Sequence, residues 1–186
     1  QIGLVWGLEN ICTMLDPTQR RMDVLQNRNS GSEKRAWSHG RDESTTGIRV
    51  KLNGDPSRFP EAGQVVAMIR QSNGKKVLEV GLVRWAAISR EDAPECGIER
   101  LRGNVKKITI SKQDEQATDR NGLLILLRSR SNYITTRILA PAGALKLGSE
   151  VSILAVGHHE AATADVRQIQ QRSRQVEVFD VQIIEN

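Results

Sequence analysis

The sequence predicts an all-β protein, mainly antiparallel, with one short helix. Short segments rich in Val, Ile and Leu alternate with polar turn segments along most of the 186 residues. Apolar residues recur at helical spacing in one place only, between Leu8 and Leu15. Asn73-Gly74 separates two strand-like segments, and Asn-Gly favours the tight turn of a β-hairpin.

The first elements follow from local pattern. A strand is predicted over Ile2–Trp6, and a helix follows Gly7 until Pro17 ends it. Residues 19–34 are polar and rich in Asn, Ser and Arg, so we expect a mobile basic loop there. The next strands are expected at 36–42, 47–53, 64–71, 75–86 and 96–101.

The second half of the chain also has strand character. After a polar linker that begins at residue 113, strands are predicted at 123–128, 133–139, 150–156, 163–171 and 176–184. Residues 148–154 faintly repeat the pattern of residues 63–69, which suggests a second barrel-like module. We therefore expect a barrel domain at 1–112, followed at 113–186 by a C-terminal β extension or a second small barrel.

Charge and cysteine content narrow the possible partners and the compartment. The net charge is +5, and residues 20–58 carry nine basic and five acidic side chains. Such a patch attracts a phosphate-bearing dinucleotide, nucleic acid, an anionic membrane or an acidic protein, although it is equally consistent with ordinary solvated surface. Cys12 and Cys96 lack C-x-x-C spacing, which favours a reduced, cytoplasmic protein, and no apolar run reaches membrane-spanning length.

Motifs for catalysis are not found. The chain has no Walker loop, no G-x-G-x-x-G and no H-E-x-x-H, so we expect a protein that is not an enzyme. His158, His159 and Glu160 are interpreted as a polar turn, because adjacent strand residues point to opposite faces and do not chelate one ion together. Trp6 and Trp85 are predicted to be core residues, and the place of Trp37 is left open.

The strongest functional signal is a D-x-S-x-x-G tract formed by Asp42, Ser44 and Gly47. It is followed by an apolar Phe59, by 63–69, by the run Val80-Gly81-Leu82-Val83-Arg84-Trp85 and by Gly97-Ile98-Glu99-Arg100-Leu101. The order of these segments resembles that of PilZ domains over about residues 36–103. Taken alone, the tract is better explained by an ordinary Asx turn leading into a strand, and it is the order of the following segments that favours the functional interpretation.

The resemblance implies a small antiparallel barrel that binds the bacterial second messenger cyclic di-GMP. Asp42 would accept hydrogen bonds from the N1–H and N2–H donors of guanine, Ser44 would contact phosphate or base, and Gly47 would leave room for the ring. The family's R-x-x-x-R signature is not found in this chain. We expect its role to be taken by arginines upstream of Gln1 or, within this chain, by Arg20 and Arg21, by Arg28, or by Lys34 and Arg35.

The expected function is therefore that of a non-catalytic cyclic di-GMP receptor without a cofactor. Ligand binding would order the basic arm and change the docking of an attached upstream domain or a protein partner. One alternative is a degenerate PilZ-like module for protein–protein contact that binds no nucleotide. The other is a barrel that binds nucleic acid, which the low aromatic content and the lack of an RNP-type motif make unlikely.

Overall fold

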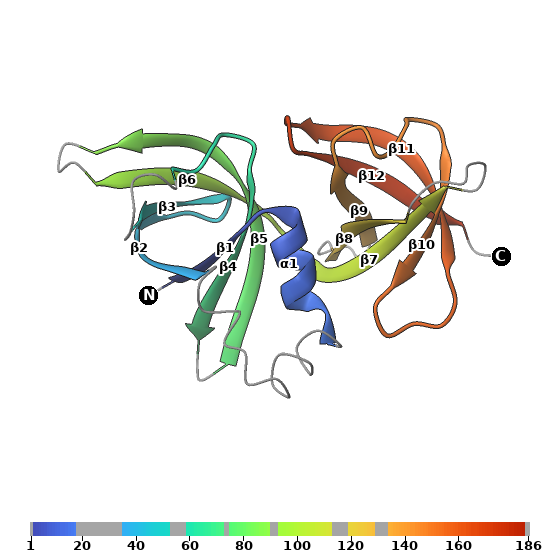
Figure 1. The fold of residues 1–186 in the computed structure, drawn as a ribbon, viewed down its shortest axis with the longest axis horizontal. Helices are drawn as coiled ribbons and strands as arrows, with labels where there is room; N and C mark the ends of the chain where they lie inside the picture. The colour runs from blue at the N-terminus through green and yellow to red at the C-terminus, as the bar shows by residue number, and fades with distance from the viewer. Residues whose placement is uncertain are drawn as a thin grey trace. The chain divides into compact units, whose positions relative to one another are not determined.

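The computed structural model describes residues 2–17, 35–52, 59–72, 75–89, 93–112, 119–128 and 134–184 (Figure 1). The loop expected at 19–34, with Arg20 and Arg21, lies outside the described residues. The chain divides into two units, Gln1–Leu101 and Arg102–Asn186.

The first unit is a closed antiparallel barrel with the strand order β1-β2-β3-β6-β5-β4. β1 pairs with both β2 and β4, and β3 pairs with β6, so two three-stranded meanders join along two seams. The strands, visible in Figure 1, are β1 (Ile2–Trp6), β2 (Arg35–Glu43), β3 (Gly47–Leu52), β4 (Val65–Ser72), β5 (Lys75–Ile88) and β6 (Pro94–Leu101).

Alternate residues of these strands fill the barrel interior. This core contains small and branched apolar side chains, as the low aromatic content predicts. Trp6 is partly buried and packs against the core, in agreement with its predicted place. The buried members are Ile2, Leu4, Ile48, Val50, Val66, Met68, Val83, Cys96 and Ile98.

The helix α1 (Leu8–Leu15) packs against β1 and β4. Leu8, Ile11 and Cys12 are its buried residues, and their spacing of three and four places them on one helical face. The predicted helix is thus confirmed. No helix in the described part of the chain has the length and hydropathy of a membrane span.

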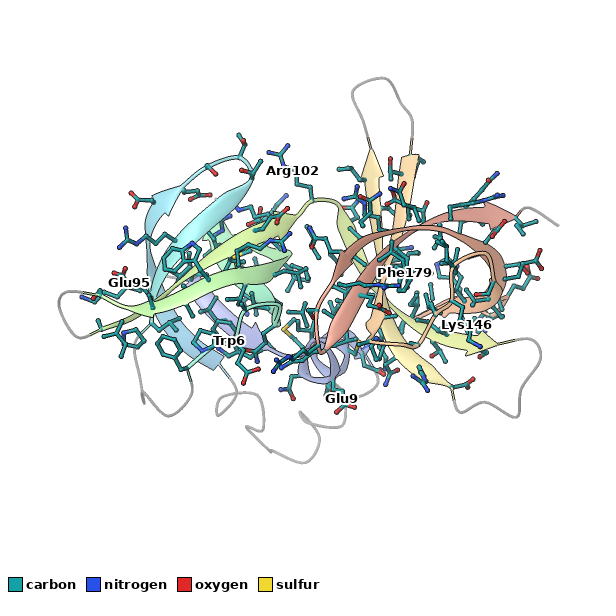
Figure 2. The ribbon with its side chains drawn as sticks, turned by 90° about the horizontal axis from the view of Figure 1, so that it is seen from above. Trp6, Glu9, Glu95, Arg102, Lys146 and Phe179 are labelled. Atoms are coloured by element: carbon teal, nitrogen blue, oxygen red, sulfur yellow. The ribbon has the colours of Figure 1, made fainter. Side chains whose placement is uncertain are left out.

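The second unit is also a closed antiparallel barrel, with the strand order β10-β11-β12-β9-β8-β7. Phe179, labelled in Figure 2, is fully buried in its core together with Ile108, Leu124, Ile138 and Val151. The strands are β7 (Asn104–Lys112), β8 (Arg120–Arg128), β9 (Ile134–Pro141), β10 (Glu150–Ala155), β11 (Ala162–Arg172) and β12 (Val176–Ile184).

Both barrels have the same topology. If β7 to β12 are matched in chain order to β1 to β6, every pairing in one barrel has its counterpart in the other, including the seams β1–β4 with β7–β10 and β3–β6 with β9–β12. The fold is therefore an all-β pair of barrels with one short helix. Of the two forms predicted for the C-terminal module, the structure shows the second barrel.

The faint sequence repeat marks equivalent places in the two barrels. Gly63 and Gly148 have φ values of 85° and 75°, a backbone conformation that favours glycine. Each donates its N–H to the carbonyl of a valine on the next strand, Val83 at 2.7 Å and Val166 at 2.8 Å. The pattern shared by residues 63–69 and 148–154 thus reflects a shared entry into β4 and β10.

The division between the units differs from the boundary predicted at 112/113. β7 had not been predicted as a strand, and that boundary would assign its residues to the first domain. In the structure β7 pairs with β8 and β10, so it completes the second barrel. Its adjacent lysines, Lys106 and Lys107, obscured the alternation that sends Ile108 and Ile110 into the core.

Candidate functional site

The D-x-S-x-x-G tract forms the hairpin between β2 and β3. The Ser44 hydroxyl accepts hydrogen bonds from the N–H groups of Thr46 at 3.3 Å and Gly47 at 3.0 Å, and the Ser44 N–H donates to the Gly47 carbonyl at 2.9 Å. A Cβ built on Gly47 would lie 3.0 Å from the Ile98 carbonyl oxygen, which is tight. Ser44 and Gly47 therefore have structural roles that require no ligand.

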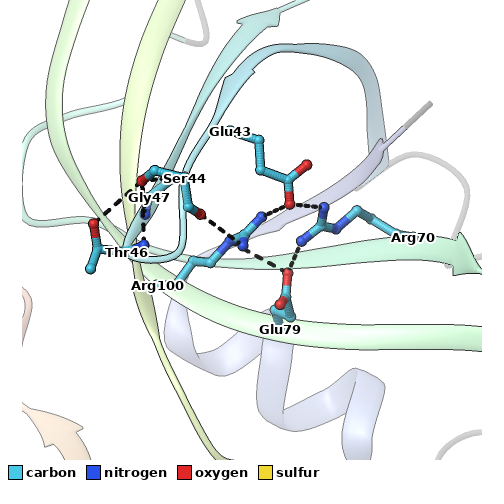
Figure 3. Close-up of polar contacts among 7 residues, drawn as sticks. All are labelled: Glu43, Ser44, Thr46, Gly47, Arg70, Glu79 and Arg100. Carbon is cyan, nitrogen blue, oxygen red and sulfur yellow. Dashed lines mark hydrogen bonds and ion pairs between the residues drawn. The ribbon is translucent and has the colours of Figure 1, made fainter.

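Four charged side chains meet at one end of the first barrel, next to this hairpin (Figure 3). Arg70 of β4 contacts Glu43 at 2.6 Å and also pairs with Glu79 of β5. Arg100 of β6 pairs with the same Glu43 oxygen and donates to the Ser44 carbonyl at 3.1 Å. We call Glu43, Arg70, Glu79 and Arg100 the ionic plug.

The plug lies in line with the core, because its members continue the inward-facing rows of their strands. Arg70 follows Val66 and Met68, and Arg100 follows Cys96 and Ile98, at intervals of two residues. Hydrogen bonds from Arg70 and then Arg100 lower the pKa of Glu43 to about 2. The plug thus holds the end of β2 to β4 and β6 and fixes the hairpin.

The matching positions of the second barrel are apolar. Ala155 and Ala162 correspond to Arg70 and Glu79, because they stand in the same register on β10 and β11 relative to Gly148 and Val166. On the other two strands, Leu126 of β8 corresponds to Glu43 of β2, and Ile183 of β12 corresponds to Arg100 of β6. All four pack against the second core, so the ionic plug belongs to the first barrel.

A second set of residues forms a row across the outer surface of the first barrel. Asp42 of β2 stands opposite Arg49 of β3, Arg49 stands opposite Gly97 of β6, and Gly97 stands opposite Trp85 of β5. Directly opposite residues share one face of a sheet, and Ile48 and Val50, which flank Arg49, face the core. The outer row therefore presents a carboxylate, a guanidinium and an indole on one surface.

Trp85 is not a core residue, which corrects the prediction. It is 42% exposed. Strict alternation would send Trp85 inward with Val83, but a β-bulge between these residues shifts the register, and Trp85 pairs with the outward Gly97. A Cβ on Gly97 would lie 2.1 Å from Trp85 Nε1, so the indole lies directly over this glycine.

Arg49 connects the two ends of the outer row. Its Nε and Nη2 donate to Oε2 of the buried Glu95, at 3.0 and 2.5 Å, and this hydrogen bonding raises the pKa of Arg49. Its Nη1 lies 3.7 Å from Asp42 Oδ2, and its Cζ lies 5.9 Å from the Trp85 ring centroid. That separation is within the range of a cation–π contact.

The sequence-predicted site residues have different positions. Asp42, Ser44 and Gly47 do come together in one hairpin, and the Asp42 side chain is 77% exposed. Arg49, which sequence reasoning missed, follows Gly47 by two residues and borders Asp42. The available signal was hairpin register: a short turn at 44–47 sets Asp42 opposite Arg49.

His158, His159 and Glu160 are exposed in a turn after β10, as predicted. Within the described ranges, no three His, Cys, Asp or Glu side chains are grouped so that they could hold a metal ion. No family model, no curated protein and no solved structure matches this chain significantly.

Proposed function

We propose that the first barrel is a non-catalytic receptor for a guanine nucleotide, with cyclic di-GMP as the ligand. The order of its sequence segments resembles that of PilZ domains, and its closed antiparallel barrel agrees with what that resemblance implies. Cys12 and Cys96 are reduced thiols, which is consistent with a cytoplasmic receptor. Binding would alter how an attached domain or protein partner docks.

The observation that carries this proposal is the exposure of Asp42 on a rigid hairpin. Its neighbour Glu43 is held in the ionic plug, whereas Asp42 points outward beside Arg49. A carboxylate accepts hydrogen bonds and suits the adjacent N1–H and N2–H donors of guanine. Since the hairpin is anchored by Arg70 and Arg100, little ordering is needed when ligand binds.

A second candidate is a protein-interaction module that binds no nucleotide. It is favoured by the Ser44 hydroxyl, whose hydrogen bonds within the hairpin account for this signature residue without a ligand. Both plug arginines are also engaged in internal hydrogen bonds. In that case Asp42 is simply an exposed strand residue.

Calorimetric titration with cyclic di-GMP distinguishes the two candidates. We expect Asp42→Asn to weaken binding by about 1.5–3 kcal/mol, the range for a hydrogen bond to a charged group. Glu160→Gln, which removes an exposed carboxylate from the second barrel, is the matched control and should bind like the wild type. Thermal unfolding of both variants should resemble that of the wild type.

Wild-type affinity in a correctly folded Asp42→Asn variant would remove Asp42 from the site. If the wild-type protein fails to bind cyclic di-GMP at millimolar concentration, the interaction module becomes the better description. Binding of single-stranded RNA in place of the dinucleotide would instead support the nucleic-acid alternative.

A further inference from the structure

We propose that the outer row Asp42–Arg49–Gly97–Trp85 is a guanine-selective base site. Its arginine, Arg49, is supplied by a strand of the first barrel itself. This inference rests on the proposed function and specifies it. Asp42 and Arg49 would read the edge of the base, and Trp85 would stack against its face. Its arginine lies on β3, so the site requires neither Arg20 nor Arg21.

The first step is the chemistry of the Asp42–Arg49 pair. The two groups are 3.7 Å apart, longer than a hydrogen bond, on neighbouring strands. Guanine presents the O6 acceptor, the N1–H donor and the N2–H donors side by side along one edge. Asp42 would accept from N1–H and N2–H, while Arg49 Nη1 would donate to O6.

The same pair discriminates against adenine. The corresponding edge of adenine carries one donor group and one acceptor, in the opposite order to guanine. It would place an N6 donor toward Arg49 and an acceptor toward Asp42. Adenine would therefore offer no acceptor to Arg49 Nη1 and no donor to the Asp42 carboxylate, which is the situation that makes polar recognition sites selective.

The second step is the stacking surface. Because Gly97 has no side chain, the Trp85 indole lies against the β6 backbone, and the ring remains substantially exposed. Flat aromatic side chains of this kind accept a base by stacking, and the nearby Arg49 adds a cation to the same surface. Arg49 lies 3.7 Å from Asp42 and 5.9 Å from the centroid of the Trp85 ring, so it would border the edge of a base that stacks on Trp85.

The third step is a comparison with the second barrel, which has an arginine at the same position but no aromatic ring beside it. Arg137 of β9 occupies the position of Arg49, and Asp180 of β12 occupies that of Gly97. Arg137 Nε donates to Asp180 Oδ1 at 2.8 Å. Gln168, which follows the matching bulge, replaces Trp85. Both arginines are ion-paired, Arg49 to Glu95 and Arg137 to Asp180, so the two barrels differ in the ring and not in the charge of the arginine. The second barrel therefore provides an internal control for the stacking surface.

The test is calorimetric titration of the whole 186-residue chain with cyclic di-GMP, GMP and AMP. Trp85→Leu should weaken cyclic di-GMP and GMP binding about tenfold or more, in line with the loss of one base-stacking contact, and Trp85→Phe should restore much of it. Arg49→Lys keeps the positive charge beside Glu95 but removes the planar guanidinium with its several donors. It should reduce the affinity for cyclic di-GMP and GMP and also the preference for GMP over AMP. Arg137→Lys should bind within about twofold of the wild type.

Thermal unfolding confirms that each variant is folded, and the outcomes separate the two proposals. Loss of cyclic di-GMP binding in Asp42→Asn with unchanged binding in Trp85→Leu and Arg49→Lys would overturn this inference and leave the proposed function standing. If GMP binding depends on Trp85 and Arg49 but cyclic di-GMP does not bind, the base site is supported and the proposed function as a cyclic di-GMP receptor is overturned. If neither ligand binds at millimolar concentration, both proposals are wrong.

Discussion

Asp180 occupies in the second barrel the position that Gly97 occupies in the first. Each lies on the last strand of its barrel, opposite an arginine on the third strand and opposite the residue that follows a β-bulge. Asp180 accepts hydrogen bonds from Arg137 and Gln170, whereas Gly97 supports an indole. Two exchanges of side chain, of Gly97 for Asp180 and of Trp85 for Gln168, thus distinguish the aromatic surface of the first barrel from the matching surface of the second.

Gly97→Ala should displace Trp85 and destabilise the first barrel. The new Cβ would meet the indole at a separation that side chains do not tolerate, and overpacking of this kind costs about 1–3 kcal/mol. Chemical denaturation gives the free energy of unfolding. In a Trp85→Ala background, Gly97→Ala should lower the free energy of unfolding much less. An equal loss in both backgrounds would show that the indole does not pack against Gly97.

The acid stability of the protein should depend on Glu43. Its pKa is lowered from 4.5 to about 2, first by the hydrogen bond from Arg70 and then by that from Arg100. A lowered folded-state pKa stabilises the protein above pH 4.5, and that contribution is lost as pH falls toward 2. Glu43→Gln should flatten the pH dependence of unfolding over this interval, and a profile as steep as that of the wild type would contradict this role.

Arg100→Leu should loosen the hairpin more than Arg84→Leu does. The Arg100 side chain is 11% exposed and bonds both Glu43 and the Ser44 carbonyl, whereas Arg84 is 46% exposed and pairs with Glu99 on the surface. We expect a cost of roughly 1–3 kcal/mol for Arg100 and at most about 1 kcal/mol for Arg84. Amide hydrogen exchange of residues 44–47 should accelerate in the first variant alone.

Both cysteines should resist alkylation in the folded protein. Cys12 and Cys96 are buried, and burial raises the pKa of the Cys96 thiol to about 12. The thiolate is the reactive species, so labelling with iodoacetamide at pH 8 should require unfolding. Rapid native labelling of Cys96 would indicate that the first barrel opens readily.

Most of the fold could be predicted because alternation and turn chemistry are local. The strands Ile2–Trp6 and Val176–Ile184 were predicted with their observed bounds, and Ser72 stands opposite Lys75, as the Asn-Gly hairpin signal requires. A bulge interrupts alternation without a distinctive residue. The outward turn of Trp85 was therefore not visible from spacing.

The candidate site was only half predictable for a related reason. Asp42 belongs to a recognisable tract, and hairpin register could have shown that Arg49 faces it. The remaining members of the outer row depend on the pairing of β3 with β6, whose paired residues lie about 50 positions apart along the chain. No local pattern encodes that pairing.

The ionic plug has a consequence for strand selection during folding. Two modules with one topology in a single chain can exchange equivalent strands, a characteristic misassembly of repeated domains. If β10 replaced β4, Ala155 would stand where Arg70 stands, and Glu79 would lose an ion-pair partner at the end of a closed barrel. The reverse exchange would set Arg70 beside Ala162 and the apolar side chains of the second core. We infer that this difference helps each strand to pair within its own barrel: the end of the first barrel is charged, and the equivalent positions of the second barrel are apolar.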